Sequence, residues 1–251
     1  MRKNDEKRKV GWFSAGAASA IATMITNPEV IAYCETGSED KDNDRFLRDC
    51  EAWFGRKITR LKSAKYRDTW DVWEKKKYIS GISGAPCTKA LKIDPRLAFQ
   101  RPGDVHIFGY TADGSDIKRA EVLREHYPDL EIETPLIDRG ITKAACIAML
   151  KRVGIDPPRV YAFGFHNANC IPCCKATSPA YWALVRMYYP DEFERMAKLS
   201  RNLGVKLTRI KGERKFIDEI PLDHSMTDPI APECDFLCQI AEDELIWKCK
   251  K

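Results

Sequence analysis

The chain has 251 residues, of which 44% are hydrophobic and 31% are charged, and its formal net charge is +5. This length predicts one domain, or one domain with a tail, around a substantial core, and the mild charge is unlike that of a dedicated nucleic-acid binder. The apolar runs are too short to span a membrane and the charged N-terminus lacks a signal-peptide pattern, so we expect a cytoplasmic protein with no membrane contact.

Strands and helices alternate along the first 165 residues. Short apolar runs predict strands at 10–14, 30–34, 58–61, 105–108, 132–137 and 160–163. Helical spacing predicts helices at 17–26, 44–54, 66–78, 116–127 and 142–153. This alternation with short connections predicts an α/β fold with a mostly parallel, doubly wound sheet.

Polar or small residues follow several of these strands, at 14–19, 35–37, 109–111 and 167–173. Ligands in such sheets bind at the carboxyl ends of the strands, near the point where the strand order reverses. We therefore expect these four segments to converge on one site.

The first of these segments has the composition of a phosphate-binding loop. It consists of Ser14, Ala15, Gly16, Ala17, Ala18 and Ser19. Small residues let backbone N–H groups approach an anion, and the N-terminus of the following helix adds about half a positive charge. The loop has no lysine and so is not a Walker loop, and close packing alone would also favour small residues.

The C-terminal part has a different character. Residues 179–203 form an amphipathic helical stretch that Pro190 could break, and the chain is loop-rich from residue 205. We therefore divide the chain into a nucleotide-binding α/β domain, 1–175, and a helical segment with a cysteine-containing tail packed on the same site, 176–251.

The chain contains ten cysteines, and several lie in local patterns suited to metal binding. The spacing Cys170-x-x-Cys173 lets two thiolates face one metal ion or cluster. Candidates for the remaining ligands are Cys87, Cys174, Cys234 and Cys238. Buried thiols or a redox pair are the alternatives, and zinc fits four cysteines as well as iron does.

These motifs resemble those of one family. The loop is similar to the Ser-Gly-Gly-x-Asp-Ser loop of the adenine nucleotide α-hydrolase-like (PP-loop) superfamily. The stretches Cys87–Pro95, Asn169–Cys174 and Glu233–Cys238 resemble, in order, three cysteine motifs of the adenylyl-sulfate reductases. Most closely, the sequence resembles phosphoadenylyl-sulfate (PAPS) reductase-like proteins carried by phages.

The resemblance implies an iron–sulfur enzyme of sulfur metabolism that reduces an adenylyl sulfate, APS or PAPS, with a thioredoxin-type thiol as reductant. It implies a 4Fe–4S cluster held by Cys87, Cys170 and Cys173, with Cys238 as the first choice for the fourth ligand. Cys174 or an open site is the alternative. Cys234 matches the family's mobile catalytic cysteine, which attacks the sulfur of the substrate.

The resemblance also assigns nucleotide contacts to Thr36, Gly37 and Gly109. The chain departs from the family pattern at several positions. Thr88 replaces a cysteine, Cys238 stands where the family has a histidine, and in the loop Ala15 replaces a glycine and Ala18 replaces the aspartate. Loss of that carboxylate weakens the case for ATP cleavage more than the case for nucleotide binding.

Two other functions remain open at this point. One is ATP-dependent thiolation of a base in tRNA or DNA, which the basic segments 2–9, 75–77 and 206–215 would favour. The other is a non-catalytic, metal-stabilised module that binds a nucleotide or a nucleic acid.

Overall fold

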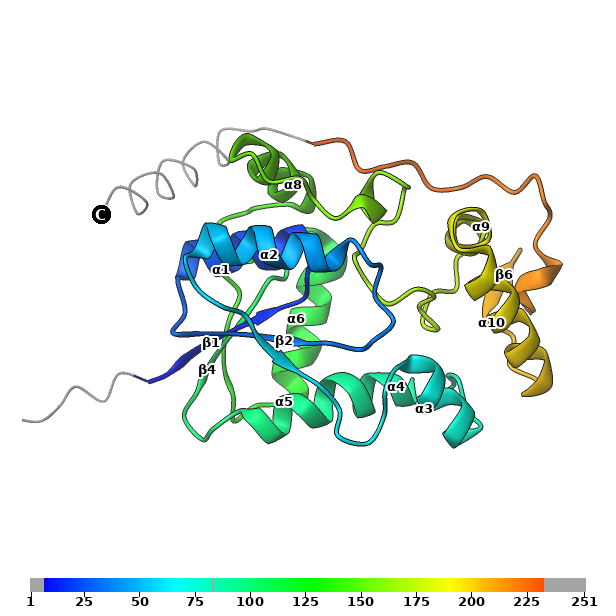
Figure 1. Cartoon of the computed structure of the whole chain (residues 1–251), viewed down its shortest axis with the longest axis horizontal. Helices are drawn as coiled ribbons and strands as arrows, with labels where there is room; N and C mark the ends of the chain where they lie inside the picture. The colour runs from blue at the N-terminus through cyan, green and yellow to red at the C-terminus, as the bar shows by residue number, and fades with distance from the viewer. Residues whose placement is uncertain (1–6, 83, 233–251) are drawn as a thin grey trace, which may run out of the picture.

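The computed structural model describes residues 7–82 and 84–232. Its centre is a five-stranded parallel sheet with the order β3-β2-β1-β4-β5 (Figure 1). The strands are β1 (Lys9–Phe13), β2 (Val30–Cys34), β3 (Thr59–Leu61), β4 (Val105–Phe108) and β5 (Glu131–Glu133). The α/β fold expected from the sequence is confirmed.

Both faces of the sheet are covered, because alternate residues of β1 point in opposite directions. Phe13 packs in a core with the helices α1 (Ala17–Thr26), α2 (Asn43–Phe54) and α8 (Lys143–Arg152). Val10 and Trp12 pack on the opposite face with Phe99, the last residue of α5 (Asp94–Phe99). Figure 1 shows α1 and α2 on one side of the sheet and α5 on the other.

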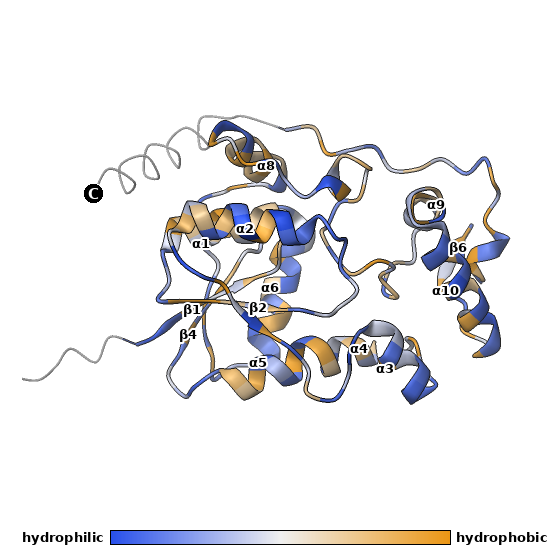
Figure 2. Cartoon of the chain, in the orientation of Figure 1, coloured by the Kyte–Doolittle hydropathy of each residue, from blue (hydrophilic) through white to orange (hydrophobic). Residues whose placement is uncertain are grey.

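Helix α1 lies at the centre of the first core because its residues are small. Ala17, Ala20, Ile21 and Ile25 are buried, and the helix packs closely against α8. It ends at Asn27, whose φ of 46° is left-handed, and a proline follows. Figure 2 shows the resulting apolar character of α1.

The C-terminal helices build a second core. The expected break at Pro190 is confirmed, since α9 (Pro179–Tyr188) ends before it and α10 (Pro190–Asn202) begins there. Trp182 and Met196 from these helices pack in one core with Trp73 of α3 (Thr69–Lys76). Figure 2 shows that α10 carries hydrophilic as well as hydrophobic residues, as an amphipathic surface helix does.

The chain after α10 has more structure than its loop-rich sequence indicates. Strands β6 (Thr208–Ile210) and β7 (Glu213–Lys215) form an antiparallel hairpin, and the short helix η3 (Ile217–Glu219) follows. In the described ranges, no helix is both long and apolar enough to cross a bilayer.

Two predicted strands are wrong in whole or in part. The run 160–163 forms no strand, and a short 3-10 turn, η2 (Arg159–Tyr161), follows two prolines there. Val160 and Tyr161 are buried, and a short buried run does not distinguish strand from helix. The run 132–137 is strand only to Glu133, because Pro135 begins the short helix α7 (Pro135–Asp138) and has no N–H for the sheet.

Other helices are close to their predicted ranges, α6 (Gly114–His126) among them. The helical run after Pro86 was not predicted. It comprises α4 (Pro86–Thr88), a π-helical turn η1 (Lys89–Ile93) and α5. The π-helical turn ends two residues before Pro95, whose ring would collide with the carbonyl four residues earlier in a regular α-helix.

Candidate functional site

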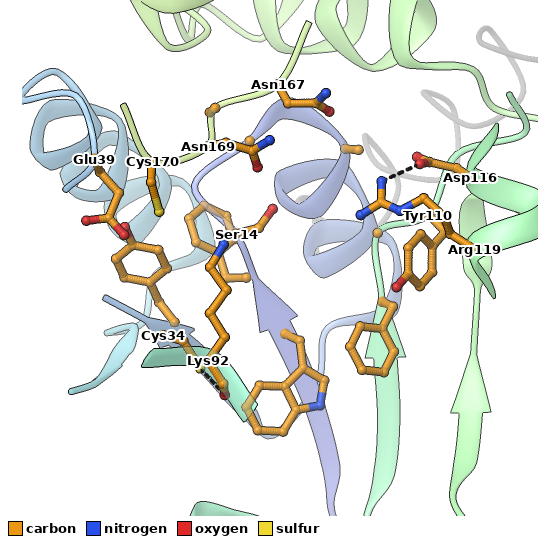
Figure 3. A pocket seen from close by; sticks show the side chains of 18 of the residues that line it. Ser14, Cys34, Glu39, Lys92, Tyr110, Asp116, Arg119, Asn167, Asn169 and Cys170 are labelled. Atoms are coloured by element: carbon orange, nitrogen blue, oxygen red, sulfur yellow. Dashed lines mark hydrogen bonds and ion pairs between the residues drawn. The ribbon is translucent and has the colours of Figure 1, made fainter. Parts of the chain in front are cut away.

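A pocket of about 320 Å³ lies at the carboxyl ends of β1 and β4. These two strands are neighbours, but the chain runs from β1 to one edge of the sheet before it returns to β4 on the other side. The pocket therefore lies where the strand order reverses, which is where parallel sheets bind ligands. Figure 3 shows Lys92 and Cys170 on one side of it and Asp116 and Arg119 on the other.

The loop that follows β1 is held by one hydroxyl group. Ser19 Oγ accepts a hydrogen bond from Ser14 N (3.1 Å) and donates one to Gly16 O (2.9 Å). Ser14, Gly16 and Ala18 line the pocket, whereas Ala15, Ala17 and Ser19 are buried. The loop therefore has its shape before any ligand binds, and the role of Ser19 is to hydrogen-bond the loop backbone.

Ala15 has an unusual backbone conformation. Its φ of 53° is left-handed, a region that non-glycine residues rarely adopt because the Cβ atom crowds the following carbonyl. Residue 15 is a glycine in the loop that this sequence resembles, so the conformation explains that preference. The strain in Ala15 lies directly beside the pocket, where tightly packed neighbours can sustain it.

Tyr161 is a pocket residue that sequence reasoning missed. Its hydroxyl accepts a hydrogen bond from Ala17 N (3.3 Å), in the first turn of α1. Burial raises the pKa of Tyr161 to about 12, so the phenol stays protonated at neutral pH. The run 160–163 was expected to be a sheet strand, and that expectation hid the role of the side chain.

Gly109 brings the end of β4 against the start of α1. A Cβ atom at this position would lie 2.7 Å from Ser19 Cα and 2.8 Å from Ser19 N. Backbone atoms cannot yield as a flexible side chain can, so residue 109 must be glycine for the loop and β4 to meet.

The segment after β2 approaches the pocket from another side. Glu39 Oε1 accepts hydrogen bonds from Thr36 N (2.8 Å) and Thr36 Oγ1 (2.7 Å), and Thr36 Oγ1 lies 2.9 Å from Cys170 Sγ. Gly37 takes a positive φ of 70°, and Arg67 O leaves no room for a Cβ atom there. Thr36 and Gly37 therefore shape the turn, while Glu39 and Cys170 line the pocket.

Four basic side chains line the pocket: Lys92, Arg96, Arg119 and Lys143. Arg119 pairs with Asp116 (2.9 Å) and lies over the ring of Tyr110. Lys143 Nζ donates to Asn167 Oδ1 (2.7 Å), and burial lowers the pKa of Lys143. Arg119 and Lys143 are thus both near Asp116. The pocket still has more basic than acidic side chains, because only Glu39 and Asp116 among its lining residues are carboxylates.

Lys92 reaches the pocket from the π-helical turn, a geometry that often occurs at functional sites. The charge of Cys170 raises the pKa of Lys92 against the effect of burial, and Glu39 acts in the same direction. Burial raises the pKa of Cys170 to about 11 even though Lys92 lowers it. The Cys170 thiol is therefore protonated at neutral pH, and the Glu39 carboxylate is the negative charge that acts on Lys92 there.

The remaining described cysteines of the predicted site do not line this pocket. Cys87 Sγ lies 3.7 Å from Cys174 Sγ, and Cys173 N donates to Tyr181 OH (2.6 Å). The hydrogen bond from Cys174 lowers the pKa of Cys87, and the same bond raises the pKa of Cys174. Cys234 and Cys238 lie outside the described residues.

The described thiols do not by themselves fit the expected cluster. Within residues 7–82 and 84–232, no three Cys, His, Asp or Glu side chains are placed to hold one metal ion. One feature suits a negatively charged sulfur: the buried indole N–H of Trp73 lies beside the Cys87 thiol and lowers its pKa. The ligand number is nevertheless too low, so the cluster stays a prediction and no chemical step is derived from it.

Comparison with known proteins identifies the fold. No protein-family model matches the sequence, and no curated protein matches it either. Among solved structures, phosphoadenylyl-sulfate (PAPS) reductase from Candida auris, in a phosphate complex, resembles the chain with a TM-score of 0.50 and 11% identity. The similarity covers 66% of this chain and 82% of that one. At this identity it shows a shared fold and leaves substrate and reaction open.

Proposed function

We propose that the chain is a sulfonucleotide reductase-like enzyme that binds an adenylyl sulfate, APS or PAPS. The observation that carries this proposal is the pocket where the strand order reverses. It combines a preshaped loop at a helix N-terminus with the basic side chains Lys92, Arg96, Arg119 and Lys143. A ligand with both a phosphate and a sulfate group could bind the loop N–H groups with one of them and the basic side chains with the other.

The two ends of the pocket suit different parts of this ligand. The backbone of residues 14–18 and the N-terminus of α1 suit the phosphate group. Phe108 and Tyr110 line the same pocket and stack on each other, which offers the adenine ring an aromatic surface. Lys92 suits the sulfate, because it is cationic at neutral pH and lies on the same side as Cys170.

In the proposed reaction Cys234 is the nucleophile. Its thiolate attacks the sulfur of the adenylyl sulfate, the bond from sulfur to the phosphate oxygen breaks, and the adenosine phosphate leaves. One thiol of a thioredoxin-type dithiol then attacks the sulfur of Cys234 and releases sulfite. The second thiol resolves the mixed disulfide, so the dithiol supplies both electrons.

The chain that precedes Cys234 supports this role. Thr227 Oγ1 donates to Gly164 O (2.9 Å), and His166 Nε2 lies 3.3 Å from Asp228 O. Residues 227–228 therefore lie beside residues 164–166, which directly precede the pocket residues Asn167 and Cys170. Figure 1 shows the chain after η3 running back toward α8. Cys234 itself lies six positions after Asp228, outside the described residues, and its approach to the pocket is part of the proposal.

The test is sulfite release by the anaerobically purified full chain, supplied with APS or PAPS and a reduced thioredoxin system. We expect sulfite and the adenosine phosphate in equal amounts. Cys234→Ser should abolish the reaction, and Cys249→Ser serves as the matched tail control with normal activity. Absence of sulfite from both nucleotides, or full activity of Cys234→Ser, would contradict the proposal.

One observation favours a second candidate, ATP-dependent thiolation of a tRNA or DNA base. Four basic side chains are exposed at the β6–β7 hairpin. Arg209, Lys211 and Arg214 lie in the hairpin, and Lys206 lies just before it. Such a cluster binds phosphate backbones with a strong salt dependence. Retention of tRNA or duplex DNA at 50 mM salt that is lost in Arg209→Glu/Lys211→Glu would support this candidate. Nucleic-acid binding that changes neither with salt nor in the charge-reversed variant would contradict this second candidate.

A further inference from the structure

The two closest thiols of the described chain come from segments far apart in sequence. Cys87 in α4 and Cys174 after the Cys170-x-x-Cys173 motif are 87 positions apart, yet their sulfur atoms are separated by only 3.7 Å. A disulfide bond has a length of about 2.05 Å, so the sulfurs need to approach by about 1.7 Å. Rotation of the side chains can supply a movement of that size.

We infer that Cys87 and Cys174 form a reversible disulfide, a redox site separate from the thiol of Cys170 in the ligand pocket. The sequence motifs grouped Cys87 with Cys170 and Cys173 as cluster ligands. Within the described residues, Cys87 Sγ lies nearest to Cys174 Sγ, and Cys170 Sγ contacts Thr36 Oγ1.

The Cys174 thiol is held in the core, whereas the Cys87 thiol is accessible to a small reagent. Cys174 is only 4% exposed and packs in the second core with Ile171 and Trp182. Its carbonyl oxygen accepts a hydrogen bond from Ser80 Oγ (3.3 Å). Cys87 is partly exposed, so a small reagent reaches Cys87 first and Cys174 acts as the resolving thiol.

A zinc ion is the main competing explanation of the short distance. Two sulfurs on one tetrahedral zinc lie about 3.8 Å apart, as follows from Zn–S bonds of about 2.3 Å. A structural zinc site needs four ligands, and within the described residues no three Cys, His, Asp or Glu side chains are placed to hold one metal ion. The disulfide needs only the two thiols that are there.

The reaction requires an oxidant, for which a low-molecular-weight disulfide such as oxidised glutathione suffices. The Cys87 thiolate attacks one glutathione sulfur, and one reduced glutathione leaves. Cys174, after loss of its proton, attacks the Cys87 sulfur of the mixed disulfide and releases the second glutathione. The protein loses two hydrogen atoms and two electrons, and one oxidised glutathione becomes two reduced molecules.

This bond would join two elements that shape the pocket. Cys87 lies in the first turn of the helical run that carries Lys92, and Cys174 lies four positions after Cys170. The disulfide fixes these two elements to each other, and its reduction frees them. The inference does not depend on which nucleotide the pocket binds.

The test is disulfide mapping of the full chain. Protein purified anaerobically, with its iron and zinc counted, is equilibrated with mixtures of reduced and oxidised glutathione, alkylated and digested with trypsin. Cys87 falls in peptide 78–89, and Cys174 falls in peptide 160–175 together with Cys170 and Cys173. We expect the two peptides to be joined under oxidising mixtures, 2 Da below the sum of the reduced forms, with Cys170 and Cys173 alkylated.

Two variants assign the bond. In Cys174→Ser the joined peptide should disappear, and in Cys173→Ser it should persist; circular dichroism of both variants checks that they are folded. Three results would overturn the inference. They are a Cys87 that stays free in every mixture, a bond from Cys87 to Cys170 or Cys173 in the unmodified chain, or one equivalent of iron or zinc that must be removed before Cys87 reacts.

Discussion

The hydroxyl of Tyr161 accepts a hydrogen bond from the backbone N–H of Ala17, at the N-terminus of α1. This contact joins a 3-10 turn late in the domain to the loop that follows the first strand. The first N–H groups of a helix have no partner within the helix, and Tyr161 accepts from one of them beside the positions where an anion would bind. Tyr161 therefore holds the loop in shape before a ligand arrives.

Replacing Tyr161 by phenylalanine tests this role. Because Ala17 N loses its acceptor, we expect Tyr161→Phe to lower the free energy of unfolding by about 1 kcal/mol. Urea denaturation measures the change. Tyr66→Phe is the control, since the Tyr66 hydroxyl makes no hydrogen bond with the described residues. Equal stability of the two variants would show that the contact does not stabilise the loop.

Gly109 is the second position where the loop is vulnerable. In Gly109→Ala the new methyl group would meet Ser19 backbone atoms at 2.7 and 2.8 Å, and such overpacking costs about 1–3 kcal/mol. Gly114→Ala has nothing within 4 Å of the added carbon and should change stability little. We expect only the first variant to lower the melting temperature and to weaken nucleotide binding. A Gly109→Ala protein with normal affinity would contradict the close approach.

Because the backbone at Ala15 is left-handed, we expect glycine to be tolerated there better than at another buried alanine. Glycine relieves about 1–2 kcal/mol of strain there, which offsets the loss of a buried methyl worth about 0.8 kcal/mol. Ala20→Gly, inside α1, loses the same methyl and also about 1 kcal/mol of helix propensity. Unfolding measurements should therefore find Ala15→Gly the more stable variant by at least about 1 kcal/mol. The opposite order would mean that Ala15 is not strained.

Asp40 gives the stability a pH dependence. Burial raises the pKa of Asp40, but hydrogen bonds from Arg159 and Tyr189 outweigh it, so the pKa of Asp40 is lowered overall. A lowered pKa stabilises the fold above the unfolded value of about 4, and that contribution is lost as the pH falls through the lower folded value.

Asp40→Asn should therefore cost stability at neutral pH and less in acid. We expect a loss of about 2–3 kcal/mol at pH 7, below the range for fully buried pairs because the Arg159 side chain is 50% exposed. Denaturation at pH 7 and pH 3 measures the difference, which should shrink at pH 3. Asp49→Asn breaks an exposed pair with Arg45 and should cost less than about 1 kcal/mol at both pH values. A pH-independent loss for Asp40→Asn would contradict the account.

The fold was predictable from the sequence where buried strands and small helices have strong patterns. The ranges of α1, β2 and β4 agree with the prediction residue for residue. Errors arose where a proline altered a short apolar run. Pro135 ended β5 early, and the prolines before Arg159 left Val160 and Tyr161 in a turn.

The site was predictable only in part, because sequence spacing does not tell which side chains meet. The loop 14–19 and Gly109 lie at the pocket, as their positions after β1 and β4 indicate. Cys170 also lines the pocket, although the strand predicted before it is absent. Tyr161 and Glu39 carry no motif, and their roles depend on contacts between distant segments. The pairing of Cys87 with Cys174 likewise results from packing of the second core.

The central claim is that the pocket between β1 and β4 binds an adenylyl sulfate through Lys92, and calorimetric titration tests it most directly. Titration of the full chain with APS and PAPS should give one binding site for at least one nucleotide. Lys92→Ala should weaken that binding about tenfold or more, because a charged contact is worth about 1.5–3 kcal/mol. Lys89→Ala, on the same helical run but paired with Asp94 at the surface, should bind normally. No binding of either nucleotide at millimolar concentration, or equal affinity of the two variants and the unmodified chain, would contradict the account.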